Sequence, residues 1–196
     1  MIKLYSNPAC PHSHRTRIVL EEKELPVDII DVDEDHPNAK LLQLNPYGKL
    51  PTIIDRDTVL FETSVVDEYL DERYPHPPLK PGSPAERAQM RLAVMQIENE
   101  VYPLYEGLEE SKKKSDAVKK LSKYLDSLNT YLAKQQFFMG ECYTLADVAL
   151  TPILWRLAPK GIDTSAWPHI EAYMDRLFER PAFERSLSEY EQMLRN

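Results

Sequence analysis

The side chain with the clearest potential for chemistry is the thiol of Cys10. The apolar alternation of residues 2–5 predicts a strand before it, and residues 12–24 are predicted to form an amphipathic helix after it. A thiol at the start of a helix lies at the positive end of the helix dipole, which lowers its pKa and favours the thiolate. Such a thiolate can attack a mixed disulfide. The alternative is that Cys10 is an unreactive loop cysteine. With no second cysteine two residues on, it cannot act as a dithiol.

The elements that must position this thiol follow from the pattern of residues 1–78. Branched apolar residues and a short connecting turn predict further strands, and helical spacing predicts further helices. The expected strands after the first helix are 27–32, 50–54 and 58–61, and the expected helices are 37–44 and 63–73. The order is therefore βαβ followed by ββα.

From residue 84 onward the pattern is helical. Ser83 followed three residues later by Glu86 forms a capping box with a proline at the first helical position. The run Thr144-Leu145-Ala146-Asp147 is an N-cap signature for another helix, which gives Asp147 a capping role in folding rather than a catalytic one. Further helices are expected at 115–135, 167–179 and 181–193, and Pro103 is expected to kink the first one.

A proline-rich segment separates the two halves. Four prolines between residues 75 and 81 exclude a helix and favour an extended, semi-rigid connector. The expected domains are 1–78 and 84–196. His76 lies among these prolines, where it is either part of a passive linker or part of an exposed docking surface, since prolines lose little entropy on binding.

The overall composition excludes several classes of protein. With 196 residues and 42% hydrophobic side chains, the chain can bury a hydrophobic core that does not need disulfides or metal ions to stabilise it. A net charge of −8 disfavours direct binding to nucleic acid. No apolar run has the roughly 18–20 residues that span a membrane, and two cysteines make no disulfide framework, so a cytoplasmic location is expected. Cys10, His12 and His14 alternate, but no further cluster completes a metal site, so none is expected.

Three motifs in order along the chain resemble the glutathione S-transferase fold: Asn45–Thr52, Phe61–Ser64 and Thr144–Asp147. The resemblance implies an α/β plus all-α chain, with a thioredoxin-like N-terminal domain and a C-terminal helical bundle. It implies that Pro51 is cis and that the backbone of Leu50 and Pro51 contacts glutathione. It also implies that Glu62 and Thr63 hold the γ-glutamyl end.

Cys10 occupies the position of the nucleophile in omega-type transferases, which implies a glutathione-dependent thiol transferase. One feature opposes glutathione. The loop Asp33–His36 has three acids where relatives commonly offer a cation, and these acids repel the carboxylates of the tripeptide.

A narrower resemblance rests on residues 69–79, 154–157 and 176–180, above all on the run Tyr-Pro-His-Pro-Pro. These segments are similar to the stringent starvation protein A family of bacteria, which keeps the transferase fold but regulates transcription. The resemblance implies a homodimer that binds RNA polymerase holoenzyme, both core and sigma factor, and requires no cofactor. The implied docking surface contains Tyr74, Pro75, His76 and Pro77. A third, broader hypothesis is an interaction protein with another partner.

Overall fold

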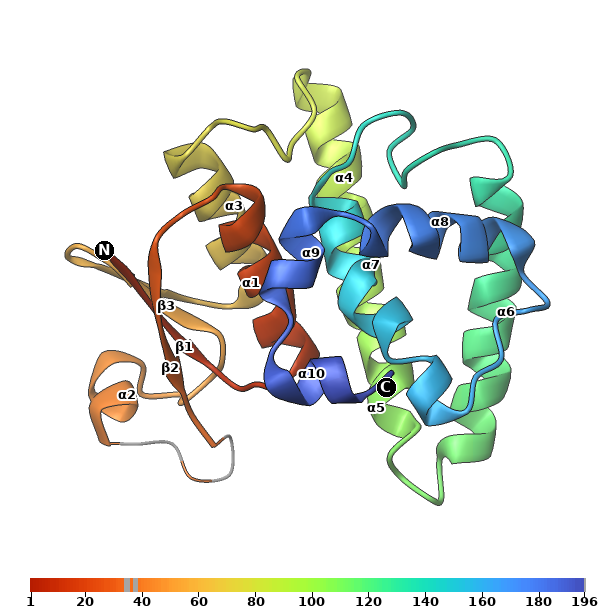
Figure 1. Cartoon of the computed structure of the whole chain (residues 1–196), viewed down its shortest axis with the longest axis horizontal. Helices are drawn as coiled ribbons and strands as arrows, with labels where there is room; N and C mark the ends of the chain where they lie inside the picture. Colours follow the sequence, from red (N-terminus) through yellow and green to blue (C-terminus); the bar gives the residue numbers. More distant parts are fainter. Residues whose placement is uncertain (34–35, 37–38, 196) are drawn as a thin grey trace. The chain divides into compact units, whose positions relative to one another are not determined.

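The structure, a computed structural model, describes residues 1–33, 36 and 39–195, and the chain divides into two compact units (Figure 1). The first unit consists of Met1–Pro78 and Pro181–Leu194, and the second of Leu79–Arg180 with Arg195. The division after Pro78 falls inside the proline-rich connector. The second unit differs from the expected range of 84–196, because the last helices of the chain pack on helix α1 of the first unit.

The first unit is built on a four-stranded mixed sheet with strand order β2-β1-β3-β4. The strands are β1 (Ile2–Ser6), β2 (Val27–Asp31), β3 (Thr52–Asp55) and β4 (Thr58–Phe61), and the helices among them are α1 (Pro11–Glu22), α2 (Ala39–Leu44) and α3 (Thr63–Arg73). β1 pairs with β2 in parallel, as the α1 crossover requires, and β3 is antiparallel to both β1 and β4. The expected βαβ–ββα order is confirmed.

Both faces of this sheet are covered. Tyr5 packs with Leu41 of α2 and with Leu50 in one buried cluster. Because side chains alternate along a strand, Leu4 faces the opposite side, where it is fully buried. Helices α1 and α3 pack against each other within the same unit. The sheet therefore fixes the start of α1, where Cys10 lies.

The chain returns to the first unit as two short helices, α9 (Pro181–Ser186) and α10 (Glu189–Met193). The single helix expected over 181–193 is wrong. Ser188 has extended backbone angles, and its hydroxyl accepts the N–H of Glu191 while the Glu191 carboxylate accepts the N–H of Ser188. This capping box starts a new helix and interrupts the old one.

The second unit is helical, with seven helical segments in its described residues. They are α4 (Pro84–Gln96), the π-helix η1 (Ile97–Val101), α5 (Tyr102–Gly107), α6 (Lys114–Leu132), α7 (Leu145–Trp155), the 3₁₀ helix η2 (Ala158–Lys160) and α8 (Pro168–Phe178). The predicted capping box of α4 and the predicted N-cap of α7 are confirmed, and Thr144 and Asp147 also form a capping box. At the expected kink, Pro103 lies in the first turn of α5, directly after the π-helix.

Helix α7 is the centre of this unit, with every residue from Leu145 to Leu154 buried. Asp147 holds its start: the carboxylate accepts the N–H groups of Phe138 and Thr144 and the hydroxyl of Tyr173, each at 2.7 Å. Burial nevertheless raises the pKa of Asp147. These contacts give Asp147 the folding role predicted for it. Within the described residues, no helix has both the length and the apolarity needed to cross a membrane.

Candidate functional site

Cys10 is the N-cap residue of α1, as the sequence predicts. Its backbone angles are extended, and its carbonyl accepts the N–H of His14 at 3.0 Å, the first hydrogen bond of the helix. The side chain of Asn7 fixes the preceding turn by accepting the N–H groups of Ala9 at 2.8 Å and Cys10 at 3.2 Å. Cys10 is 8% exposed. The thiol therefore lies at a helix N-terminus with limited access.

His12 lies in the first turn of the same helix and links it to α3. Its Nδ1 is 3.4 Å from the hydroxyl of Thr63. Burial, followed by the positive charge of Arg15, lowers the pKa of His12 from 6.5 to about 4, although Glu62 acts in the opposite direction. The imidazole is therefore neutral at pH 7. It offers a hydrogen-bonding group beside Cys10 but no positive charge.

The turn before β3 contains Leu50 and Pro51, joined by a cis peptide bond as the resemblance implies. Asn45 stabilises this turn, because its amide donates to the carbonyl of Lys49 at 3.1 Å and to the hydroxyl of Thr52 at 3.0 Å. The Thr52 hydroxyl in turn donates to the carbonyl of Lys49 at 2.7 Å. These buried bonds give the backbone of Leu50 and Pro51 a fixed position.

Strand register brings the predicted residues to one end of the sheet. Thr52 pairs with Phe61 on one side and with Tyr5 on the other. Pro51 and Glu62 are the next residues beyond this row, and the chain that leads to Cys10 continues from the same end of β1. The predicted thiol, the cis-proline turn and the start of α3 therefore lie at the same end of the sheet.

Glu62 has a backbone φ of 69°, which residues other than glycine seldom adopt and which is typical of ligand sites. Its carbonyl accepts the N–H of Val66 at 3.0 Å, whereas no side-chain hydrogen bond of Glu62 caps α3 in the described structure. The Glu62 side chain therefore does not cap α3. Its carboxylate pairs with the amino group of Lys49, and both groups are half exposed. A ligand ammonium would have to displace Lys49.

The acidic loop after β2 is described only in part. Asp33 Oδ2 and His36 Nδ1 are 2.9 Å apart at the surface. Glu34 and Asp35, on which the expected repulsion of glutathione also depends, lie outside the described residues. The repulsion stays a prediction.

The proline-rich segment Pro75–Pro78 is exposed at all four residues. The residue before it is anchored: the hydroxyls of Tyr74 and Tyr69 both donate to Asp55 Oδ2, at 3.1 and 3.0 Å. Burial and this carboxylate raise the pKa of both tyrosines. Tyr74, predicted as part of the docking surface, therefore uses its hydroxyl inside the first unit and exposes only part of its ring.

A second anchor holds the other end of the segment. The amino group of Lys23 is fully buried, pairs with Asp71 at 2.5 Å and donates to the carbonyl of Pro77. The His76–Pro77 peptide bond is cis. With Tyr74 fixed on one side and Pro77 on the other, the segment is held in a defined shape while its side chains remain in solvent.

The alternating Cys10, His12 and His14 do not form one site. His14 is fully buried, with Nδ1 3.3 Å from Glu191 Oε1 and Nε2 3.1 Å from the Ser186 hydroxyl. His12 instead contacts the start of α3. Among the described residues, no group of three or more potential metal ligands is found.

Two family models match this chain. The model described as "Glutathione S-transferase, N-terminal domain" matches residues 9–73, and the one described as "Glutathione S-transferase, C-terminal domain" matches residues 73–181. A protein of Coxiella burnetii named stringent starvation protein A homolog is 43% identical over 199 residues, covering 100% of this chain and 95% of that protein. The chain belongs to the stringent starvation protein A family.

Solved structures give the same fold. A glutathione transferase from Methylococcus capsulatus is 30% identical with a TM-score of 0.88, covering 98% of this chain and 100% of that one. A glutathione transferase family member from Pseudomonas fluorescens, solved with two glutathione bound, is 25% identical with a TM-score of 0.84, covering 95% and 92%. The thioredoxin-like first unit and the helical second unit are thus those of a glutathione S-transferase.

Three residues that matter to these sites were not predicted as site residues. His12 was considered only as a metal ligand, and its placement in the first turn of the helix is the sequence signal for its contact with Thr63. No local sequence pattern marks Lys49 or Lys23, because their partners are distant in sequence. Lys49 pairs with Glu62 across the β3–β4 hairpin, and Lys23 donates to the carbonyl of Pro77, 54 residues further along the chain.

Proposed function

We propose that this chain is a transcription regulator that binds RNA polymerase holoenzyme in the cytoplasm through the exposed segment Pro75–Pro78. The observation that carries the proposal is that this segment is exposed at every residue yet anchored at both ends. Membership of the stringent starvation protein A family supports the same function.

The physical argument is one of preorganisation. A flexible loop loses conformational entropy when it binds, roughly 0.5–1.5 kcal/mol for each ordered side chain. Here Lys23 already fixes the carbonyl of Pro77, and Asp55 already fixes Tyr74. His76 is the polar member of the exposed segment, and its imidazole offers a donor and an acceptor to the partner.

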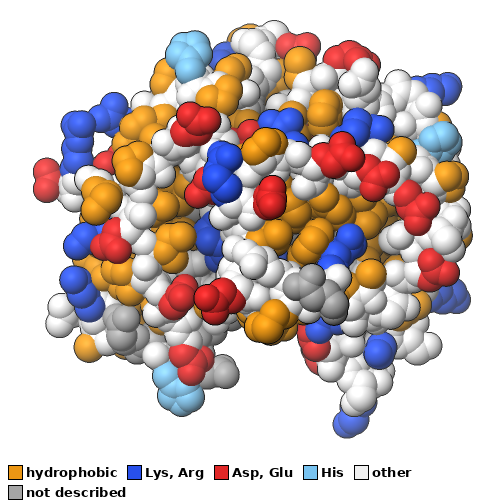
Figure 2. Space-filling view, in the orientation of Figure 1, with side chains coloured by type: hydrophobic (Ala, Val, Ile, Leu, Met, Phe, Trp, Pro, Cys, Tyr) orange, Lys and Arg blue, Asp and Glu red, His pale blue; other side chains and the backbone are white. Residues whose placement is uncertain are grey.

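Charge favours a protein partner over direct contact with DNA. The net charge is −8, and acidic and basic side chains are interspersed on the face shown in Figure 2. Affinity for nucleic acid depends on basic groups that neutralise phosphates. We infer that any effect on transcription is exerted through the polymerase.

The test is a pull-down with purified core enzyme and holoenzyme. Combined replacement of Pro75, His76 and Pro77 by alanine should abolish retention of the holoenzyme. The matched control is His169→Ala, which removes another exposed histidine and should bind like the wild type. Failure of the wild type to bind, or equal binding by the triple variant, contradicts the proposal.

We also propose that the chain forms a homodimer through the face of β4 and α3. Leu60, Val65 and Tyr69 line a cavity of about 410 Å³ on this face, and Val65 is 51% exposed. Exposed apolar side chains grouped on one face are typical of subunit contacts. Val65→Glu should shift sedimentation from dimer to monomer, whereas Thr58→Glu, on the exposed start of β4 and outside the lining, should not. A monomeric wild type would contradict the dimer.

The second candidate function is a glutathione-dependent thiol transferase. The favouring observations are Cys10 at a helix N-terminus, the cis peptide before Pro51 and the strained backbone of Glu62. In this reaction the Cys10 thiolate attacks the glutathionyl sulfur of a mixed disulfide, and the substrate thiolate leaves and takes up a proton. A second glutathione thiolate then attacks Cys10–S–S–glutathione, which gives oxidised glutathione and restores the thiolate.

Two features of the site oppose strong glutathione binding: the ion pair of Lys49 with Glu62 and the limited exposure of Cys10. Reduction of a glutathione mixed disulfide tests this function, with Cys10→Ser as the inactive variant and Cys142→Ser as the control at the exposed cysteine. Activity that survives Cys10→Ser excludes this nucleophile. A glutathione titration without binding at millimolar concentration excludes the activity itself.

A further inference from the structure

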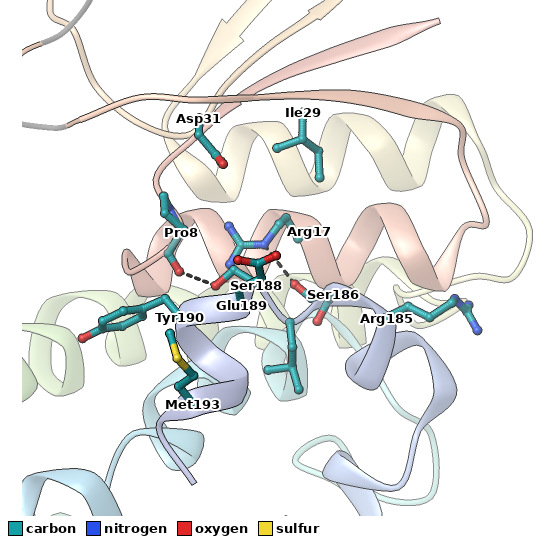
Figure 3. Close-up of a pocket in the computed structure, with 11 residues that line it drawn as sticks. Pro8, Arg17, Ile29, Asp31, Arg185, Ser186, Ser188, Glu189, Tyr190 and Met193 are labelled. Carbon is teal, nitrogen blue, oxygen red and sulfur yellow. Dashed lines mark hydrogen bonds between the residues drawn. The ribbon is translucent and has the colours of Figure 1, made fainter. Parts of the chain in front are cut away.

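A groove of about 630 Å³ lies in the first unit between β2 and the helices α9 and α10 (Figure 3). Three large apolar side chains that line it are exposed: Ile29 at 45%, Tyr190 at 44% and Met193 at 66%. In Figure 3, Ile29 and Asp31 extend from the strand on one side, and Tyr190 and Met193 from α10 on the other. None of these residues takes part in the sites described above.

The floor of the groove is firmly built. The Arg17 guanidinium donates to both carboxylate oxygens of Glu191 at 2.7 Å and to the carbonyl of Ser186 at 3.0 Å. The hydroxyl of Ser188 donates to the carbonyl of Pro8 at 2.7 Å. The charged floor groups are buried, since the side chains of Arg17 and Glu191 are 6% and 0% exposed. The groove therefore has a fixed shape.

One wall of the groove is the edge of the sheet. β2 is an outer strand, and in the described residues no strand pairs with its free side. The N–H of Val32 donates to the carbonyl of Ser6 on the β1 side at 2.8 Å. Because main-chain groups alternate along a strand, the N–H and C=O groups of Ile29 and Asp31 point away from β1. The residues whose side chains line the groove thus also present main-chain donors and acceptors at the open edge.

The lining of the groove contains both arginines and acidic residues, and they differ in whether they are paired. Both arginines that line it are already paired, Arg17 with Glu191 and Arg185 with Glu21 at 2.8 Å. Asp31 and Glu189 are exposed, and among the described residues neither has a cation within ion-pair distance. The uncompensated charge beside the apolar side chains is therefore negative, which favours a cationic partner.

We propose that β2 and this groove bind an extended segment of a partner protein, which adds to the sheet as a further strand. One side chain of that segment is apolar and inserts between Ile29 and Met193. The side chain two positions along, on the same face, is lysine or arginine and lies against Asp31 and Glu189. Main-chain hydrogen bonds supply affinity in this mode, and alternate side chains supply specificity. This surface is separate from the proline segment and does not depend on polymerase binding.

The probe is an eight-residue peptide, Thr-Val-Thr-Lys-Thr-Val-Thr-Lys, with blocked ends, titrated into the ¹⁵N-labelled full chain. Amide shifts should change at Ile29, Asp31 and Tyr190. A peptide with glutamate in place of lysine should not bind, and a peptide N-methylated at alternate residues should not bind, because it lacks the donors for strand pairing. Equal binding of the N-methylated peptide, or shifts located elsewhere, would overturn the proposal.

Charge reversal tests the groove itself. Asp31→Lys with Glu189→Lys should weaken peptide binding about tenfold, which corresponds to about 1.4 kcal/mol and to two surface charge pairs. The matched control, Asp57→Lys with Glu141→Lys, reverses two exposed acids elsewhere and should leave the affinity unchanged. Unchanged affinity in the first variant would refute the assignment. Concentration-dependent self-association of the wild type that is lost in this variant would instead assign the open edge to a second copy of this chain.

Discussion

His12 makes the stability of the protein depend on pH in a predictable direction. Its folded pKa is about 4, against an ordinary 6.5, because burial and Arg15 disfavour the charged imidazole. Between these values the unfolded chain binds a proton at His12 that the folded chain does not. Stability therefore rises as pH increases from 4 to 6.5, and it is lost as pH falls through the same window.

The size of the effect follows from the two pKa values. At pH 7 the folded imidazole is almost entirely neutral and about a quarter of the unfolded one is protonated, so His12 changes the free energy of unfolding by only about 0.2 kcal/mol. At pH 5 the unfolded histidine is almost fully protonated and the folded one is not. Linkage then makes protonation stabilise the unfolded chain by about 2 kcal/mol more at pH 5 than at pH 7.

The assay compares urea-induced unfolding of the wild type and His12→Asn at pH 7 and pH 5. The wild type should lose about 2 kcal/mol more than the variant on acidification, because asparagine does not titrate. His169→Asn, at an exposed histidine, should keep the wild-type difference. The Cε1 proton of His12 gives a direct NMR titration. An imidazole that titrates near 6.5, or equal losses in wild type and His12→Asn, would refute the reasoning.

Three further substitutions test the buried polar contacts. Asp147→Ala should lower the free energy of unfolding by at least about 3 kcal/mol, since three donors, two of them buried, lose their acceptor. A thermal melt within a degree of the wild type would contradict this. Lys23→Met should cost about 3–5 kcal/mol by removing the buried ammonium group that pairs with the Asp71 carboxylate, and the added Asp71→Leu should recover most of it in urea unfolding. Glu191→Ala should cost about 3–5 kcal/mol because Arg17 loses its carboxylate partner. Limited proteolysis should then cut α10, and a variant that resists cleavage there would contradict the prediction.

Much of the fold was predictable because its signals are local. The capping boxes at Ser83 and Thr144 depend on residues three positions apart, so the sequence alone locates the starts of α4 and α7. The βαβ–ββα order likewise follows from runs of a few residues. The third capping box, Ser188 with Glu191, has the same spacing and could have divided the expected helix 181–193 correctly.

The candidate sites were less predictable because their decisive contacts are not local. The neutral state of His12 depends on its burial beside Thr63 at the start of α3. The ion pair between Lys49 and Glu62 depends on how the β3–β4 hairpin brings the two residues together. Lys23 carries no motif, yet it fixes the proline segment through Pro77. Sequence patterns identify which residues can do chemistry, but long-range packing decides the charge and the neighbours that those residues have.

The return of residues 181–194 to the first unit has a consequence for how the protein is made. The thioredoxin-like strands are synthesised before the helical unit, whereas Ser186 and Glu191, which bind Arg17 and His14, belong to α9 and α10 and are synthesised after it. While the helical unit is being synthesised, Arg17 therefore lacks the Glu191 carboxylate that pairs with it in the folded chain. The first unit can be completed only after the helical unit has been synthesised, so a chain truncated near residue 180 would lack the helices that complete the first unit.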